Sequence, residues 1–197
     1  MAPIALATRA DLGAVSATLT QAFADDPVQR WLFAEAPDYM AALGDFMGFF
    51  VERYFALGHV YVAPGGVGAT LWAPPDRHAL GDADLAPLFA CVAGHVGDRA
   101  EPGLMELGRT IDYLPDEPHV YLGIAGVDPA AQGGGVGAAL MEPGLRLADE
   151  GGFAVHLESS NPRNLSFYHR HGFSPIGEFR CGGDDGPSMT PMRREPR

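Results

Sequence analysis

A glycine-rich segment, Gln132-Gly133-Gly134-Gly135-Val136-Gly137-Ala138, opens an apolar, helix-forming run. The first turn of a helix has unpaired backbone N–H groups and carries the positive end of the helix dipole. Glycines leave these groups open to a phosphate because no side chains cover them. The segment therefore predicts a pyrophosphate site, although glycines also permit tight turns and close contact between a helix and a sheet.

Four other side chains have the chemistry to move protons. Tyr168 lies on a predicted helix, and its phenol is the first candidate to protonate a leaving group; the alternative is a core aromatic beside Phe167 and Phe173. A nucleophile that loses a proton needs a proton acceptor, for which Glu158, Asp26 and His119 are the candidates. Glu158 is the first choice because it ends a predicted strand, whereas Asp26 also fits a helix cap and His119 an exposed strand start.

The elements that position these residues follow from hydrophobic periodicity and turn residues. The first two thirds predict a strand (3–7), helices (12–23, 27–33, 37–57), a hairpin (59–63 with 67–72), helices (84–96, 101–113) and a loop (114–118). The final third predicts a strand (119–127), the glycine segment with its helix to about 150, a strand (153–158), a helix (162–169) and strands (173–180, 188–193). The strand–helix–strand unit makes strands 119–127 and 153–158 parallel. Pro143 and Gly144 predict a bend or an early break in the helix between them.

Composition limits the class of protein. A chain of 197 residues fits one domain, 1–197, and no apolar run approaches the length needed to cross a bilayer. The N-terminus lacks the pattern of a secretion signal, so we expect a cytoplasmic location and no membrane partner. Two isolated cysteines, Cys91 and Cys181, predict free thiols and no metal site. The net charge of -12 argues against nucleic acid and mildly favours a cationic ligand, although acidic surfaces also serve solubility.

Two families bind nucleotides through segments like this one. Gly133-x-Gly135-x-x-Ala138 fits the dinucleotide fingerprint G-x-G-x-x-A, which leaves a nucleotide oxidoreductase as an alternative. In that fold the glycines follow their strand directly, whereas here residues 128–132 intervene. The run 127–137, VDPAAQGGGVG, instead resembles the acetyl-CoA motif V-x-P-x-x-[RQ]-G-x-G-x-G of the GCN5-related N-acetyltransferase (GNAT) family.

A second motif strengthens this resemblance. Residues 161–173, NPRNLSFYHRHGF, resemble the family's later signature, an Asn and a Tyr on a helix followed by a Gly-Phe turn. Residues 22–25, the Leu71-Trp72 strand end and residues 162–168 look like puromycin N-acetyltransferase and the actinobacterial enzymes around it. The resemblance spans most of the chain and is weakest over 38–117. Asp26 departs from it, because a tyrosine is expected there.

The resemblance implies a fold and a cofactor site. The fold is mixed α/β, with a mostly antiparallel sheet that splays open between its fourth and fifth strands and is flanked by helices. Acetyl-CoA would lie in the gap, with pantetheine paired to the backbone of Ala125 and Val127; Gly123 and Gly126 suit a bulge or a close backbone approach. The residues implied for pyrophosphate are Gln132, through its side-chain amide, and Gly133, Gly134, Gly135, Val136, Gly137 and Ala138, through their N–H groups. Asn161 and Asn164 are either helix-start residues or CoA contacts.

The resemblance also implies direct transfer of acetyl to an amine. Tyr168 would contact the cofactor and protonate the departing thiolate, and Glu158 would accept the amine's proton. Asp26, Trp31, His119 and Glu158 would border the acceptor, a small molecule for which an antibiotic or an aminonucleoside is a candidate. The alternatives are a non-catalytic acyl-CoA sensor and an enzyme that acetylates protein N-termini or lysines. The expected assembly is a monomer or a homodimer.

Overall fold

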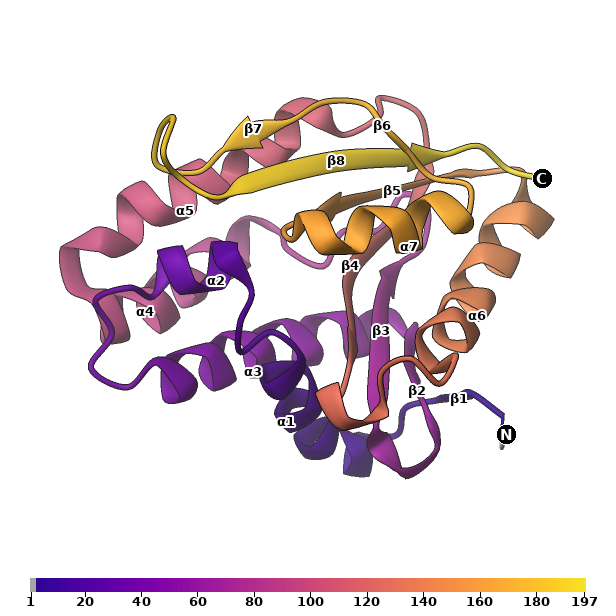
Figure 1. Cartoon of the computed structure of the whole chain (residues 1–197), viewed down its shortest axis with the longest axis horizontal. Coiled ribbons are helices and arrows are strands. Elements are labelled where there is room, and N and C mark those ends of the chain that lie inside the picture. Colours follow the sequence, from indigo (N-terminus) through magenta and orange to yellow (C-terminus); the bar gives the residue numbers. More distant parts are fainter. Residues whose placement is uncertain (1–2) are drawn as a thin grey trace.

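One mixed β-sheet runs through the protein in the computed structural model, which describes residues 3–197 (Figure 1). Its strands are β1 (Ala5–Leu6), β2 (Val60–Val62), β3 (Gly68–Ala73), β4 (His119–Val127), β5 (Ala154–Ser159), β6 (Ser174–Pro175), β7 (Phe179–Arg180) and β8 (Ser188–Arg194). The strand order is β1-β2-β3-β4-β5-β8-β6, with β7 also paired to β8. All of these pairs are antiparallel except β4 with β5, as predicted.

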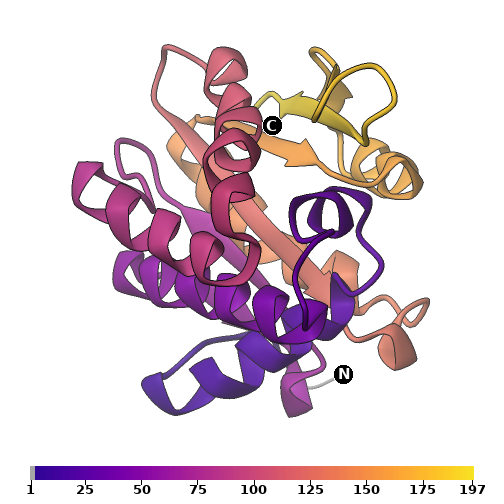
Figure 2. The same ribbon diagram turned by 90° about the vertical axis from the view of Figure 1, so that its left-hand side faces the viewer.

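Helices cover both faces of this sheet. They are α1 (Leu12–Ala22), α2 (Pro27–Leu32), α3 (Tyr39–Leu57), α4 (Asp82–Val96), α5 (Ala100–Gly108), α6 (Val136–Gly151) and α7 (Leu165–Arg170). Short 3-10 turns join them at Arg9–Asp11, Pro64–Gly66, Gly97–Arg99, Arg109–Tyr113, Pro129–Ala131 and Pro162–Asn164. Helix α4 packs on α3, and α5 contacts both α4 and α2 (Figure 2). None of the helices in residues 3–197 has the length and apolar character that a bilayer crossing requires.

Side-chain alternation along β3 divides the core into two layers. Ala69, Leu71 and Ala73 pack with α1 and α3, whereas Trp72 packs on the other face with Leu122 and α6. Every residue of β3 is buried, because the strand lies between β2 and β4 and is covered on both faces. Strand β3 is therefore a fully buried central strand, and β4 followed by β5 continues the sheet on one side of it.

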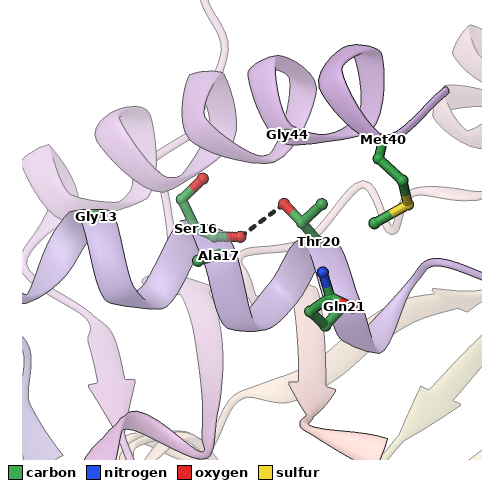
Figure 3. A pocket seen from close by; sticks show the side chains of 7 residues that line it. All are labelled: Gly13, Ser16, Ala17, Thr20, Gln21, Met40 and Gly44. Atoms are coloured by element: carbon green, nitrogen blue, oxygen red, sulfur yellow. Dashed lines mark hydrogen bonds between the residues drawn. The ribbon is translucent and has the colours of Figure 1, made fainter. Parts of the chain in front are cut away.

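Helices α1 and α3 cross closely because small residues face each other. A Cβ placed on Gly48 would lie 3.4 Å from the Ser16 hydroxyl, and one on Gly44 would lie 3.9 Å from that of Thr20. Thr20 donates its hydroxyl to the Ser16 carbonyl at 2.8 Å, within α1 (Figure 3). The surface hollow drawn there is lined by Gly13, Ser16, Ala17, Thr20, Gln21, Met40 and Gly44. None of these is a predicted site residue.

Three predicted elements differ in the structure. Of the bend or early break predicted in helix α6, the early break was wrong, because the helix continues from Val136 to Gly151 through Pro143. The predicted strand 173–180 is two short pieces, β6 and β7, separated by residues 176–178, and a Cβ on Gly177 between them would overlap the Tyr113 ring. The predicted helix 101–113 ends as an α-helix at Gly108 and continues as a 3-10 turn to Tyr113.

Strand β4 carries an extra residue and then separates from β5. Leu71 of β3 pairs with Ile124, and the next residue, Trp72, pairs with Leu122, so Gly123 forms a β-bulge. The parallel pairing with β5 covers only residues 119–121 of β4 against 154–156 of β5. Beyond this point β4 continues to Val127 without β5 beside it, which confirms the expected splay. We call this opening the β4–β5 split.

Candidate active site

Polar side chains line up on one face of β5 beside the β4–β5 split. His156, Glu158 and Ser160 are two residues apart, so they project to the same side of the strand. Tyr121 lies directly opposite His156 on β4, and it contacts the core layer formed by α1 and α3. The split therefore opens beside a row of polar groups formed by His156, Glu158 and Ser160, with Tyr121 opposite; we call these residues the row.

Glu158 lies at the centre of this row, and its side chain is only 5% exposed. The Tyr121 hydroxyl donates to Glu158 Oε2 at 2.5 Å, and His156 Nε2 lies 2.7 Å from Glu158 Oε1. Burial raises the pKa of Tyr121 well above its usual range, and the charge of Glu158 raises it further. The phenol therefore keeps its proton and acts as a donor to the carboxylate.

The bulge at Gly123 brings a second tyrosine to this place. A Cβ on Gly123 would overlap the Tyr54 hydroxyl, so Tyr54 of α3 occupies the space that glycine leaves open. Burial raises the pKa of Tyr54, with a further contribution from the Glu158 charge. On the same strand, a Cβ on Gly126 would lie 2.7 Å from Leu19 of α1. Both glycines thus serve the bulge or close approach predicted for them.

Asp26 closes the far end of the row. Its Oδ1 accepts the N–H groups of Val28 and Gln29, which caps α2, and its Oδ2 accepts the Ser160 hydroxyl at 2.5 Å. Burial raises the pKa of Asp26, while these hydrogen bonds oppose the rise. Asp26 is therefore the helix cap that its sequence allowed, and it also lies beside β5.

Tyr168 lies on α7 and is 8% exposed. Its ring packs edge-to-face on Phe173 and Phe167, with centroids 5.9 and 5.4 Å away, so it belongs to the core layer on the α6 side. Its hydroxyl makes no side-chain hydrogen bond within residues 3–197. Burial raises the pKa of Tyr168 to about 12, and the charge of Asp26 adds to this effect. The phenol is protonated and available as a donor.

The glycine segment forms an open turn before α6. Gly133 and Gly135 have φ angles of 79° and 82°, a conformation that glycine adopts without strain. A Cβ on either would meet no atom within 4 Å, so the space above the turn is open. The first intrahelical bond runs from Ala139 N–H to the Gly135 carbonyl, which leaves the N–H groups of Val136, Gly137 and Ala138 without helical partners. This geometry fits an anion.

Ala125 and Val127 direct their backbone groups into the split. Asp128 N–H donates to the Val67 carbonyl next to β3, and successive residues of a strand point to opposite edges. Val127 and Ala125 therefore face the edge from which β5 has separated. Gln132 donates its side-chain amide to the Val127 carbonyl at 3.1 Å, which places it between the split and the glycine turn.

The remaining predicted residues are less central. The Asn161 side chain accepts the Arg163 N–H at 3.1 Å, as a helix-start residue does, and the exposed Asn164 makes no side-chain cap bond. His119 is half-buried rather than fully exposed, and its ring centroid lies 6.0 Å from that of His156. Burial lowers the pKa of His119. Trp31 packs on the turn before β8, where a Cβ on Gly182 would lie 2.6 Å from its ring nitrogen.

Three residues of the site were not predicted from the sequence: Tyr121, His156 and Ser160. A signal for two of them was present, because β5 reads Ala-Val-His-Leu-Glu-Ser and then Ser160, with polar residues at alternate positions of a buried strand. Tyr121 carries no such signal. Within residues 3–197 no cluster of three or more His, Cys, Asp or Glu could hold a metal ion.

Comparisons with known proteins agree with this geometry. The sequence model of the Acetyltransferase (GNAT) family matches residues 69–173, more than half of the chain. An uncharacterized N-acetyltransferase of Schizosaccharomyces pombe is 26% identical over 174 residues, which cover 83% of this chain and 70% of that protein. A mycothiol acetyltransferase of Jonesia denitrificans is 39% identical over 70 residues, 32% of this chain and 22% of that protein.

Solved structures share the fold over the whole chain. A Corynebacterium glutamicum protein, "histone acetyltransferase HPA2 and related acetyltransferase", is 28% identical with a TM-score of 0.70, covering 99% of this chain and 96% of its own. A Drosophila melanogaster polyamine N-acetyltransferase has a TM-score of 0.67 at 16% identity, over 98% of both chains, which shows the fold alone. With the split sheet and the glycine turn, these matches establish that the chain belongs to the GNAT family of acetyltransferases.

Proposed function

We propose that the protein is an acetyl-CoA-dependent N-acetyltransferase that acetylates the amine of a small molecule directly. The observation that carries the proposal is the β4–β5 split, where the unpaired backbone edge of β4 adjoins a row of titratable side chains. The GNAT family uses acetyl-CoA, and acetyl transfer follows from membership of that family.

The residues around the split fit this cosubstrate. Acetyl-CoA supplies a thioester whose acetyl group is activated toward an amine. The N–H groups of residues 133–138, in the open turn and the first turn of α6, would bind its pyrophosphate. The backbone of Ala125 and Val127 would pair with pantetheine along the free edge of β4. Gln132, which already reaches Val127, would add a side-chain amide donor.

Proton transfers would use Glu158, at the centre of the row, and Tyr168 on α7. The amine loses its proton to Glu158 as its lone pair forms the new C–N bond. Tyr168 donates its proton to the sulfur that leaves, because the pKa of about 12 keeps the phenol protonated at neutral pH. Asp26 borders the acceptor and attracts its positive charge.

Two features support a small acceptor rather than a polypeptide. Val28 of α2 packs in one cluster with Phe179, Cys181 and Met189, so α2 contacts the β7–β8 segment next to Asp26. These two segments would close one side of the acceptor site at Asp26. Buried carboxylates at Glu158 and Asp26 suit a compact cationic amine. The segments 22–25 and 162–168 add an antibiotic or aminonucleoside such as puromycin to the candidates. The proposal takes residues 1–197 as one domain, a monomer or homodimer acting in the cytoplasm.

The test measures free thiol released from acetyl-CoA, with puromycin, small mono- and polyamines, and a peptide N-terminus as acceptors. We expect release that depends on a small amine and falls at least tenfold in Tyr168→Phe, with CoA binding retained. Tyr61→Phe is the control, because this hydroxyl lies on β2 and contacts His59. CoA binding without turnover would indicate a sensor, activity on the peptide alone a protein acetyltransferase, and binding of NADH but not CoA an oxidoreductase.

A further inference from the structure

His156 is a fully buried residue of the row, with 0% of its surface exposed. Its ring stacks on that of Tyr121, with centroids 6.0 Å apart and planes 16° apart, and meets the edge of the His119 ring at 6.0 Å. Its Nε2 atom has a hydrogen-bond partner, Glu158 Oε1 at 2.7 Å. Its Nδ1 atom is buried and has no partner in the part of the chain that the structure describes.

These contacts define where the imidazole proton lies. An ionised carboxylate oxygen can only accept a hydrogen bond, so Nε2 must carry the hydrogen that lies between His156 and Glu158. Nδ1 then carries no hydrogen, and its lone pair lies in the protein interior without a donor among the described residues. A buried acceptor without a partner lowers the stability of the fold. Stability alone therefore does not explain a histidine at this position.

We propose that His156 is a positioning residue for Glu158: together with Tyr121 it holds the carboxylate at the split and keeps it ionised to accept the proton of the attacking amine. This inference rests on the proposed function. The lone pair of the amine nitrogen forms the new C–N bond, and the C–S bond of the thioester breaks. The N–H bond breaks, its electron pair stays on nitrogen, and the proton moves to a Glu158 oxygen. The Nε2 hydrogen stays on His156 and continues to bridge to the carboxylate.

The other charged and titratable groups near His156 and Glu158 do not hold the Glu158 carboxylate, so this role belongs to His156 and Tyr121. Tyr54 faces Glu158 from α3 and adds no hydrogen bond to it within residues 3–197. Arg193 lies opposite His156 on β8, but its guanidinium binds Glu117 and Glu195.

The two remaining neighbours have partners of their own. His119, at the edge of the His156 ring, donates Nδ1–H to the Glu117 carbonyl at 2.9 Å. Asp26 is held by Ser160 at the next alternate position of the row. Among residues 3–197, the carboxylate of Glu158 thus has two side-chain donors, one on each oxygen.

The pH dependence of the reaction reports this role. A donor that bonds the ionised carboxylate favours that form, so removing the donor moves the acidic limb of kcat/KM to higher pH. One charge-assisted hydrogen bond corresponds to a shift of about one pH unit. Because His156 and Glu158 interact directly, the limb belongs to the pair rather than to either residue.

The experiment compares the pH profiles of kcat/KM for the parent, His156→Leu, His156→Gln and Tyr121→Phe. Glutamine places an amide nitrogen the same number of bonds from Cα as Nε2, so it retains the donor, whereas leucine removes it. We expect the limb to move up by about one unit in His156→Leu and in Tyr121→Phe, and to stay close to the parent in His156→Gln. In a Glu158→Gln background, His156→Leu should cause no further loss of rate.

A second measurement does not depend on activity. Nitrogen-15 NMR of the His156 ring should show the hydrogen on Nε2 in the parent, and a changed Nε2 signal in Glu158→Gln. A hydrogen on Nδ1 in the parent, or an unmoved limb in His156→Leu, would overturn the inference. If no amine is acetylated while the Nε2 form is observed, the proposed function fails and the positioning role for an amine base fails with it. If the ring carries Nδ1–H in an active enzyme, only the inference fails.

Discussion

The Ser160 hydroxyl donates a 2.5 Å hydrogen bond to the Asp26 carboxylate, and these two residues are 134 positions apart in the sequence. Because Asp26 also caps α2 through Val28 and Gln29, this single carboxylate joins the start of α2 to the end of β5. The end of the β4–β5 split beside Asp26 is therefore held by a buried polar contact.

Ser160→Ala should lower the free energy of unfolding by about 1–3 kcal/mol, because one buried oxygen of Asp26 loses its donor. Burial raises the pKa of Asp26 above its unfolded value near 4, and the Ser160 hydroxyl opposes this rise. The stabilising effect of the hydroxyl is therefore present well above that raised pKa and is lost as the pH falls through it toward 4. Urea unfolding at pH 7 and pH 4 measures the difference, which should be smaller at pH 4. Ser166→Ala, at an exposed position of α7, should change stability by no more than about 0.5 kcal/mol.

Two glycines inside helices should respond to alanine with opposite signs. A Cβ on Gly144 of α6 would overlap the Trp72 indole, so Gly144→Ala should destabilise the fold by about 1–3 kcal/mol through overpacking. Gly94 of α4 has no atom within 4 Å of that position, so Gly94→Ala should raise stability by about 0.5–1 kcal/mol. Thermal unfolding of both variants decides this, and a loss in both would show that the indole contact is not the cause.

A cation beside the glycine turn should strengthen binding of CoA. Gln132 lies between Val127 and the turn, so Gln132→Arg would add a charged donor where the pyrophosphate is proposed to bind. Isothermal titration with CoA should show an affinity about three- to tenfold higher, and the gain should shrink with added salt. Gln21→Arg adds the same charge on the exposed surface of α1. An equal gain in this control would assign the effect to net charge alone.

The ion pair between the buried Arg194 and the half-buried Asp149 should make stability depend on pH. Both guanidinium nitrogens of Arg194 bind the carboxylate at 2.8 Å, and the Arg194 side chain is 4% exposed. The hydrogen bonds from Arg194 hold the pKa of Asp149 below its usual value. The stabilisation is therefore present above pH 4 and is lost as the pH falls through the lowered value.

Asp149→Asn should accordingly cost about 3–5 kcal/mol at pH 7 and give a flatter dependence of unfolding free energy on pH. Denaturant titrations at pH 7, 4 and 3 test this. Asp45→Asn serves as the control, because the side chain of Asp45 is 69% exposed and pairs only with His95. Parallel pH curves for the parent and Asp149→Asn would contradict the assignment.

Sequence patterns predicted the parts of the site that depend on neighbouring residues. The open turn at Gly133 and Gly135 follows from consecutive glycines, and the position of Tyr168 follows from its motif on one short helix. The parallel pairing of β4 with β5 followed from the helix between them. Each of these features is specified locally, by turn chemistry or by the order of elements.

The row of titratable groups could not be derived in the same way. Tyr121 reaches Glu158 only because β4 pairs with β5 in a register that sets Tyr121 opposite His156. Ser160 reaches Asp26 only because α2 packs beside the end of β5. Register and helix placement result from packing across the whole sheet, and no short stretch of sequence contains them. The continuity of α6 through Pro143 likewise depends on its packing against the sheet.

The bulge at Gly123 changes the parity of β4. Before it, the odd-numbered Tyr121 faces α1 and α3; after it, the even-numbered Ile124 and Gly126 do. A regular ladder, with Gly123 paired to Leu71, would exchange the two faces for every later position of the strand. It would also turn the backbone of Val127 from the open edge toward β3. A single inserted glycine thus fixes the phase in which the second half of β4 meets the split.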